Sequence, residues 1–366
     1  METAAVVADN WAFVRHMFPA DLDESARQFG ALVRRRQITC ADDLLRLALG
    51  YSVCDMSLRQ AAAWADAMGL CSMSDVAVME RLQKSEQWLG HLIVCWLQQR
   101  RRPGEITRAR VRIIDATVLT GPGSTGTDWR LHLGLDLERM CISSVELTGP
   151  EGGESFARHC FDAGEIVVGD CGYGQRAGVA CALEQGAHAL VRINWQNFPL
   201  LTAGHEPLDI VGYMEPLQPG EIGDWQVAFE HGSRCYPMRL IAIRKSPQAT
   251  EKARRKIRRE ARRKHHRPDP RSLRAAAFIY VLTDLPPDML PAREALELYR
   301  LRWQIEIFFK RLKGILNFDG LRAQDERLVR TYIYGKILGA LIVDELRALA
   351  LAFFPWGYPL RSQAAE

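Results

Sequence analysis

The spacing of apolar residues changes along the chain. Up to about residue 105, apolar positions recur every three to four residues, as they do in amphipathic helices. Helices are expected at 41–49, 57–68, 75–82 and 85–99, and Ser57 is a suitable N-cap residue. Residues 1–105 are therefore predicted to form a helical N-terminal domain.

Two of these predicted helices are close neighbours in the chain. Residues 57–68 and 75–82 are separated by a short segment that contains Gly69, which is the outline of a helix-turn-helix. An ordinary helical hairpin has the same pattern, so both interpretations stay open.

From residue 106 the apolar residues alternate with polar ones, as they do in strands. Strands are expected at 110–115, 129–136, 140–147, 165–170 and 187–193, with helices at 154–160 and 175–185. Alternating strands and helices predict an α/β fold with a mixed sheet covered by helices. We assign residues 106–195 to the first part of this core.

The remaining chain is predicted to interrupt the core and then complete it. Residues 196–285 carry expected strands at 208–211, 224–229, 236–243 and 276–282, and a basic helix at 251–266. We interpret them as a β-rich insertion. Residues 286–354 would return to the core, with one helix that begins after Pro291 and a second, at 325–353, packed behind it. Residues 355–366 would be a C-terminal tail.

The composition is that of a soluble globular protein, with 48% hydrophobic and 25% charged residues. Nine cysteines are scattered without Cys-x-x-Cys spacing, which argues against a disulfide framework and a structural zinc site. We therefore expect a cytoplasmic protein.

The charge is distributed unevenly. The net charge is only +4, but residues 251–274 contain twelve Lys and Arg against three acids, which leaves the remainder mildly acidic. One strongly basic arm on an acidic body indicates a polyanionic partner that is contacted at chosen places.

Three acids stand in positions that favour metal chemistry. Asp115 and Asp170 each end an apolar strand, and Glu306 lies on a late helix. Carboxylates without a His or Cys cluster are ligands for hard cations, Mg²⁺ or Mn²⁺. Two such ions could activate a water or a 3′-hydroxyl for phosphodiester displacement. Each Asp taken alone could equally be ordinary turn chemistry.

Polar residues also follow one face of the helix around Glu306. Tyr299, Arg302, Glu306 and Lys313 project within an arc of roughly 60° if the whole segment is helical, and the apolar residues gather on another arc. Such a face could hold a metal and a phosphate backbone. A solvated, salt-bridged helix face has the same pattern.

These motifs together resemble a known family. Asp115-Ala-Thr117, Asp170-Cys-Gly-Tyr173 and the spacing Tyr299-x2-Arg302-x3-Glu306-x6-Lys313 are similar to the DDE transposases of bacterial insertion sequences. The last motif is the Y-R-E-K signature of the family-four insertion sequences. Segments 127–132, 152–155 and 190–193 also look like family segments, and Cys171 departs from the Arg that is often found after the second Asp.

The resemblance implies roles for individual residues. Asp115, Asp170 and Glu306 would be the metal-binding catalytic triad, with two Mg²⁺ or Mn²⁺ ions, in an RNase H-like core. Tyr299, Arg302 and Lys313 would hold phosphates of the transposon end. Trp303 would stack on an extruded base, although a core tryptophan is the alternative.

Further residues are candidates for DNA contacts, each with a solvated surface as the alternative. They are Arg130 and His132 on one strand, Arg192 at a strand end, and Arg254, Arg255, Arg258 and Arg259 in the basic arm. The helical N-terminal domain would also bind DNA.

We therefore expect a DNA transposase that binds inverted terminal repeats, cleaves them and joins the 3′-ends to target DNA. Its partners would be both DNAs and a second copy of the chain in the synaptic complex. Two alternatives are a catalytically silent, domesticated transposase that only binds DNA, and an RNase H-like nuclease limited to hydrolysis.

Overall fold

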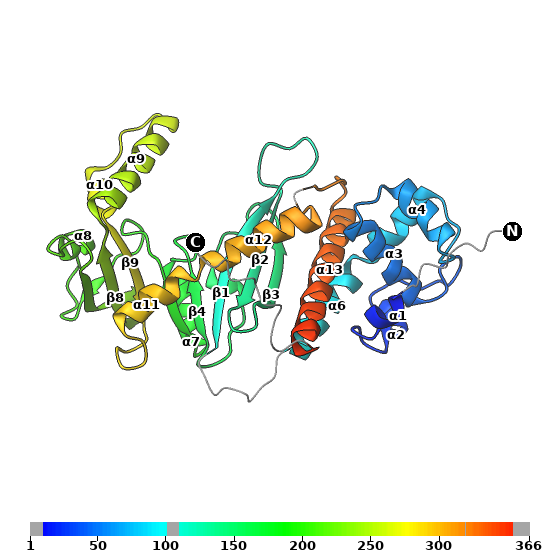
Figure 1. The fold of residues 1–366 in the computed structure, drawn as a ribbon, viewed down its shortest axis with the longest axis horizontal. Helices are drawn as coiled ribbons and strands as arrows, with labels where there is room; N and C mark the ends of the chain where they lie inside the picture. Colours follow the sequence, from blue (N-terminus) through cyan, green and yellow to red (C-terminus); the bar gives the residue numbers. More distant parts are fainter. Residues whose placement is uncertain (1–9, 101–109, 319, 354–366) are drawn as a thin grey trace, which may run out of the picture. The chain divides into compact units, whose positions relative to one another are not determined.

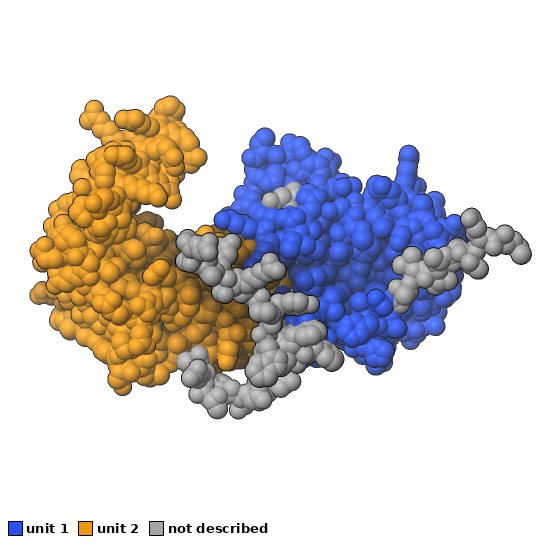
Figure 2. All heavy atoms as spheres, viewed as in Figure 1, with its two compact units in different colours: residues 1–104, 118–130, 309–366 blue, residues 105–117, 131–308 orange. Residues whose placement is uncertain are grey.

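The computed structural model describes residues 10–100, 110–318 and 320–353 (Figure 1). They fall into two compact units, coloured in Figure 2. Unit 1 takes its described residues from 1–104, 118–130 and 309–366, and unit 2 from 105–117 and 131–308. The predicted tail at 355–366 lies outside the described residues, and the predicted division into five segments stays a prediction.

Unit 1 is built from helices. They are α1 (Trp11–Arg15), α2 (Leu22–Gln28), α3 (Ala41–Val53), α4 (Leu58–Ala67), α5 (Asp75–Lys84), α6 (Glu86–Arg100) and α13 (Glu326–Phe353). The long α13 packs against α3, α5 and α6. Its predicted position behind the Glu306 helix is therefore wrong, because its apolar face is buried by the N-terminal helices. No helix in the described part of the chain is long and apolar enough to cross a membrane.

The N-terminal helices begin where the sequence predicts. Ser57 and Gln60 form a capping box at α4, and the Ser74 side chain accepts from the Ala77 N–H at the start of α5. The connection between the two helices spans residues 68–74, which is longer than the roughly three to four residues of a helix-turn-helix. The pair therefore has the geometry of a helical hairpin.

One buried cation holds three parts of unit 1 together. The Lys336 side chain on α13 is fully buried, and its Nζ lies 2.6 Å from Asp55 Oδ1 and 3.3 Å from the Asn317 carbonyl. It also donates to the Leu316 carbonyl at the end of α12. The Tyr332 hydroxyl donates to Asp55 as well. Lys336, Tyr332 and Asp55 thus form one hydrogen-bonded cluster.

Unit 2 and the adjoining strand segments form one nine-stranded sheet. Its order is β3-β2-β1-β4-β5-β9-β8-β7-β6, and β1, β4 and β5 are parallel. The strands of the first half are β1 (Val111–Leu119), β2 (Trp129–Asp136), β3 (Cys141–Thr148), β4 (Ile166–Gly169) and β5 (His188–Val191). The order β3-β2-β1-β4-β5 in the first half of the sheet is that of the RNase H-like fold. The predicted fold class is therefore confirmed.

Residues 196–285, the predicted insertion, extend this same sheet. Their elements are β6 (Leu201–Thr202), α8 (Ile210–Met214), β7 (Ile222–His231), β8 (Arg234–Arg244), α9 (Pro247–Arg263), α10 (Pro270–Ala275) and β9 (Phe278–Thr283). The last strand, β9, pairs antiparallel with both β5 and β8. The strand expected at 208–211 is wrong, because Ile210, Val211 and Met214 bury together on one side of α8.

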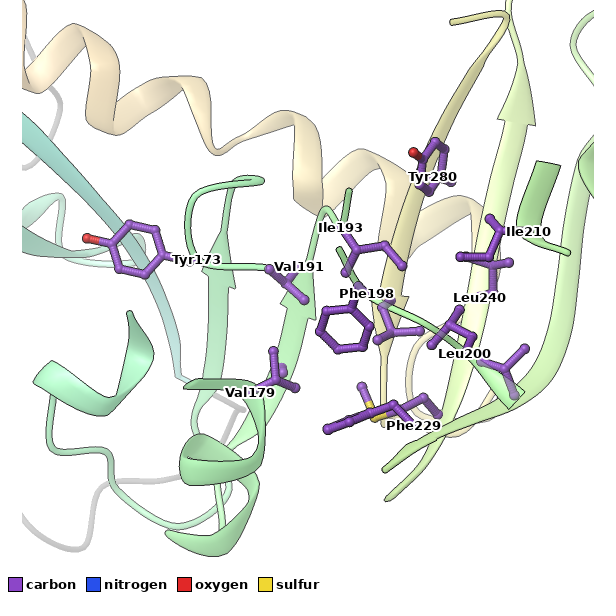
Figure 3. Close-up of a cluster of buried hydrophobic side chains, with 14 of the residues drawn as sticks. Tyr173, Val179, Val191, Ile193, Phe198, Leu200, Ile210, Phe229, Leu240 and Tyr280 are labelled. Carbon is purple, nitrogen blue, oxygen red and sulfur yellow. The ribbon is translucent and has the colours of Figure 1, made fainter. Parts of the chain in front are cut away.

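Side chains alternate between the two faces of the sheet. One face carries a core cluster that includes Ile114, Val167 and Val191, and Figure 3 shows Phe198 and Phe229 gathered in it. Helices α7 (Arg176–Glu184) and α8 supply side chains to this cluster. Helix α11 (Ala292–Arg300) packs on β5, β7 and β8 without entering the cluster, so it covers the other face.

The segment with the Y-R-E-K spacing is two helices, not one. Helix α11 ends at Arg300, and α12 (Trp303–Leu316) follows it. Between them the amides of Leu301 and Arg302 bond carbonyls three residues back, which tightens the chain into a turn. The single arc expected for Tyr299, Arg302 and Glu306 is therefore wrong, because it assumes uninterrupted α-helical geometry.

The helix expected at 154–160 is also mostly absent. Only Phe156–Arg158 forms a 3₁₀ turn, η1, capped by the Ser155 side chain. His159 after it has extended backbone, which ends the turn. The segment is consequently a loop that can lie close to the end of β4.

The Lys336 cluster makes a testable prediction. Asp55→Asn should lower the free energy of unfolding by about 1.5–3 kcal/mol, the range for a hydrogen bond to a charged group, because Lys336 keeps its burial and loses its counter-ion. Arg59→Ala is the control, since it breaks an ion pair whose Arg side chain is 90% exposed. Chemical denaturation measures the free energy of unfolding of both variants. An equal decrease in the two variants would contradict the prediction.

Candidate active site

The two strand-end acids lie side by side. The parallel pairing of β1 and β4 places Ile113 next to Val168. Asp115 and Asp170 stand two residues further along each chain, so they fall at the same level and on the same face as those two residues. That face is the one opposite the core cluster, which α11 covers.

Asp115 is held in a position that disfavours its charge. Its side chain is 15% exposed, and its Oδ1 accepts the Ala116 N–H at 2.8 Å. Burial raises the pKa of Asp115 to about 7, and the negative charges of Asp170 and Glu154 add to the effect. The Arg302 guanidinium and the Ala116 N–H act in the opposite direction.

Asp170 is fixed by the loop that follows it. Its Oδ1 accepts the Gly172 N–H at 2.8 Å, and its carbonyl accepts the Gly174 N–H at 3.1 Å. The chain turns sharply here, because the Asp170 carboxylate accepts a hydrogen bond from the backbone N–H two residues later, as in an Asx-turn. Asp170 is thereby held beside Asp115 at the end of the sheet.

Glu306 reaches these acids through an arginine. It stands in the first turn of α12, and Arg302 Nη2 lies 2.6 Å from its Oε1. The Nη1 of the same guanidinium lies 3.6 Å from Asp115 Oδ2. Arg302 therefore neutralises one acid from the sheet and one from the helix.

The expectation that the three carboxylates converge within reach of one ion pair is not met. In the described part of the chain, no three His, Cys, Asp or Glu side chains gather closely enough to hold a metal. Instead, Arg302 pairs with both Asp115 and Glu306 and stands between these two acids. The donor set still suits a hard divalent cation, since all its atoms are carboxylate oxygens.

A further carboxylate, Glu154, belongs to this neighbourhood. A Cβ placed on Gly172 would meet Glu154 Oε2 at 1.7 Å and Asp170 Oδ1 at 3.1 Å, so both oxygens approach the same glycine. Gln175 Nε2 donates to the Glu154 carbonyl at 2.9 Å and holds this segment to the loop. Glu154 is not among the predicted site residues. Its only signal is the Gly-Gly-Glu-Ser segment.

The predicted phosphate and base contacts lie in different surroundings. Tyr299 is half-buried at the end of α11, and burial raises its pKa to about 12, so its phenol stays a proton donor. Trp303 is 48% exposed, so the alternative of a core tryptophan is wrong. Lys313 lies seven residues after Glu306 on α12, in the part of the helix that belongs to unit 1.

Two of the three predicted contacts around the strands stay candidates. Arg192 follows β5, and its charge acts on Cys171 and Tyr299 beside the Asp170 loop. Arg130 is half-buried on β2.

A DNA contact by His132 is wrong, because its ring is fully buried between the Tyr173 hydroxyl and the Thr148 hydroxyl, at 3.3 and 3.2 Å.

The four arginines of the basic arm also differ. Arg255, Arg258 and Arg259 lie exposed on α9, and the first two pair with Glu251 at 3.2 and 3.3 Å. Arg254 turns inward instead, and its Nε donates to the Leu273 carbonyl at 3.0 Å. Figure 1 shows α9 beyond the ends of β8 and β9.

Comparisons with known proteins identify the family of this chain. The model of a family described as transposase DDE domain matches residues 106–342. The transposase InsL for insertion sequence element IS186A of Escherichia coli (strain K12) is 36% identical over 356 residues, 95% of this chain and 96% of that protein. The transposase for insertion sequence element IS421 of Escherichia coli is equally similar, with 36% identity over 357 residues and the same coverage.

Two more distant similarities are also found. The transposase for insertion sequence element IS231F of Bacillus thuringiensis subsp. israelensis is 23% identical, over 90% of this chain and 77% of that protein. Among solved structures, the piggyBac transposase synaptic complex with hairpin DNA aligns with a TM-score of 0.48 and 9% identity, over 95% and 77% of the two chains. Since the family model covers more than half of the chain and two relatives match nearly all of it, this protein belongs to the DDE transposases of bacterial insertion sequences.

Proposed function

We propose that this transposase cleaves the inverted terminal repeats of an insertion sequence and joins the 3′-ends to target DNA, with Asp115, Asp170 and Glu306 as its catalytic carboxylates. The observation that supports the proposal most is the parallel register that brings Asp115 and Asp170 to one level of the sheet. The Arg302 bridge then ties Asp115 to Glu306.

The family generally uses divalent metal ions. Mg²⁺ or Mn²⁺ fits these residues, because they offer only carboxylate oxygens and because Asp115 lies in a field of like charges that a cation would relieve. Asp115, Asp170 and Glu306 would hold two ions. Such a pair supplies an activated water or 3′-hydroxyl and stabilises the leaving oxygen.

The surrounding residues would position the DNA. Arg302 offers a planar guanidinium to a phosphate, and Tyr299 offers a phenol that keeps its proton. The side chain of Arg192 has a buried Nε without a partner in the described structure, which suits an anionic ligand. Lys313 and Arg130 remain proposed contacts.

Two further surfaces would bind DNA without chemistry. The helical N-terminal domain would bind the terminal repeat. The exposed arginines of α9, Arg255, Arg258 and Arg259, would contact phosphates without reading sequence. A second copy of the chain would join the synaptic complex, and nine free thiols favour the reducing cytoplasm as its compartment.

The triad can be tested by substitution. Glu306→Gln and Asp170→Asn should each abolish cleavage and strand transfer, while binding to terminal-repeat DNA stays within about threefold of wild type. The double variant should be no worse than either single one, since both damage the same site. Asp288→Asn, an exposed acid in the same unit, is the control.

Products from labelled ends in Mg²⁺ would decide between the candidate functions. Cleavage with strand transfer supports a transposase, and cleavage alone supports a hydrolytic nuclease. Binding without cleavage supports a catalytically silent transposase. Near wild-type cleavage by Glu306→Gln would remove Glu306 from the triad.

The pKa of Asp115 predicts a pH dependence of stability. In the folded protein this acid keeps its proton up to about pH 7, whereas an unfolded chain releases it near pH 4. The folded state therefore binds more protons between these values, and its stability falls as pH rises through that window. Asp115→Asn should remove a loss on the order of 2–4 kcal/mol between pH 4 and pH 8.

Denaturant titrations in EDTA at both pH values would measure this loss, with Asp288→Asn as the control. Mg²⁺ should then stabilise the wild type more at pH 8 than at pH 5, because only the ionised carboxylate binds it. An Asp115→Asn protein with the pH dependence of the wild type would contradict the assignment.

The exposure of Trp303 predicts a role in handling an unpaired base. Trp303→Ala should leave the melting temperature nearly unchanged, because about half of the side chain is exposed. It should slow cleavage of paired ends by roughly 1–3 kcal/mol of lost stacking. Substrates with a mismatch or an abasic site near the end should recover most of the rate. An equal defect on every substrate would argue against base stacking.

A further inference from the structure

A small cavity lies at the base of α9, where the basic arm leaves the sheet. Its volume is about 230 Å³, several times the roughly 30 Å³ that a water occupies in the liquid. Arg244 and Lys245 line it from the end of β8, and Thr250, Glu251 and Arg254 line it from α9. All of these residues belong to unit 2.

Carboxylates do not neutralise the three cations. Within the described structure, Arg244, Lys245 and Arg254 form hydrogen bonds only to backbone carbonyls. These run from Arg244 Nη1 to Glu215 (3.1 Å) and Leu217 (2.6 Å), from Lys245 Nζ to Ala276 (2.8 Å), and from Arg254 Nε to Leu273 (3.0 Å). Glu251, the acid in the lining, pairs with Arg255 and Arg258 instead.

The three cations are also withdrawn from solvent. Arg244, Lys245 and Arg254 are each half-buried, whereas Lys252 and Lys256 on the same helix are exposed. Burial, together with the nearby charge of Arg192, lowers the pKa of Lys245 to about 8. The three positive charges repel one another and so destabilise the folded protein. An anion bound between them would offset this repulsion.

The start of α9 adds a second source of positive potential. Ser246 caps the helix, Pro247 follows it, and both Pro247 and Thr250 line the cavity. The first turn of a helix carries partial positive charge, which favours anions, although the N–H groups of Ala249 and Thr250 are already bonded to Ser246. Thr250 also supplies a hydroxyl, a hydrogen-bond donor of the kind that oxyanions accept.

From this cavity, we infer an oxyanion site in which Arg244, Lys245 and Arg254 hold one phosphate group. Its source would be a phosphodiester of the DNA that runs past the exposed face of α9, an assignment that rests on the proposed function. The arm would then have one fixed phosphate contact at its base and weaker, exposed contacts along its length. Free inorganic phosphate is the other source with the same chemistry.

Inorganic phosphate can probe the cavity in the DNA-free protein. At constant ionic strength, phosphate should raise the melting temperature of the wild type in a saturable manner, as a ligand of the folded state does. Lys245→Met should need at least ten times more phosphate for the same shift. Lys252→Met removes one exposed charge from the same helix and should match the wild type.

Two results would overturn the site. One is an equal response of all three proteins, which would make phosphate a general salt effect. The other is a calorimetric titration of the wild type that shows no saturable heat, a result that does not depend on how well Lys245→Met folds.

A duplex without terminal-repeat sequence tests the DNA source. Lys245→Met should reduce the slope of log K against log salt by about 0.9, the value for one lost phosphate contact, and phosphate should compete with the duplex. Saturable phosphate binding with an unchanged slope and no competition would overturn the DNA source in favour of a free anion. Cleavage of terminal repeats by the wild type, scored separately, reports on the proposed function alone.

Discussion

The organisation of the helical unit depends on one buried ammonium. A lysine without solvent contact is tolerated only if its three protons find acceptors, and Lys336 finds Asp55 and the carbonyls of Leu316 and Asn317. Those acceptors come from the turn after α3 and from the end of α12, so a single side chain on α13 connects the two ends of the sequence. The carbonyls at the end of a helix are natural partners for a cation, because they carry partial negative charge and lack partners in the helix.

Charge compensation also shapes the candidate active site. The sheet places Asp115 and Asp170 at one level, and burial together with the neighbouring charge raises the pKa of Asp115, a perturbation of the kind that gathers at functional sites. Arg302 stands beside Asp115 and Glu306, so the signature arginine serves the protein's own acids. The same guanidinium is the proposed phosphate ligand. Its position therefore connects the charge balance of the acids with the binding of DNA.

In this chain, the pattern of neighbouring residues predicts local structure well. It does not predict contacts between residues that are far apart in the sequence. The strand at Trp129–Asp136 can be predicted from alternation alone, and Ser57 is recognisable as a cap. The turn between α11 and α12 cannot, because Leu301 and Arg302 are ordinary helix formers whose geometry is set by packing. Alternation likewise separates the two faces of a strand without telling that both are buried, as they are on β2 from Leu131 to Asp136, so it misjudges His132. Asp55 and Lys336 are 281 residues apart, and no periodicity connects them.

The continuity of the sheet through the insertion has a consequence for changes in chain length. The antiparallel pairing of β5 with β9 is reinforced by Asp284, which accepts from the Ala189 N–H and contacts His188, both at 2.7 Å. Deleting residues 196–285 would therefore expose the β5 edge, a row of unpaired N–H and C=O groups that recruits other strands. Changes of length at the tip of the β7–β8 hairpin or at the far end of α9 would leave this pairing intact. The segment can thus change in length at these two points without opening the sheet, whereas its loss as a whole would leave an open sheet edge.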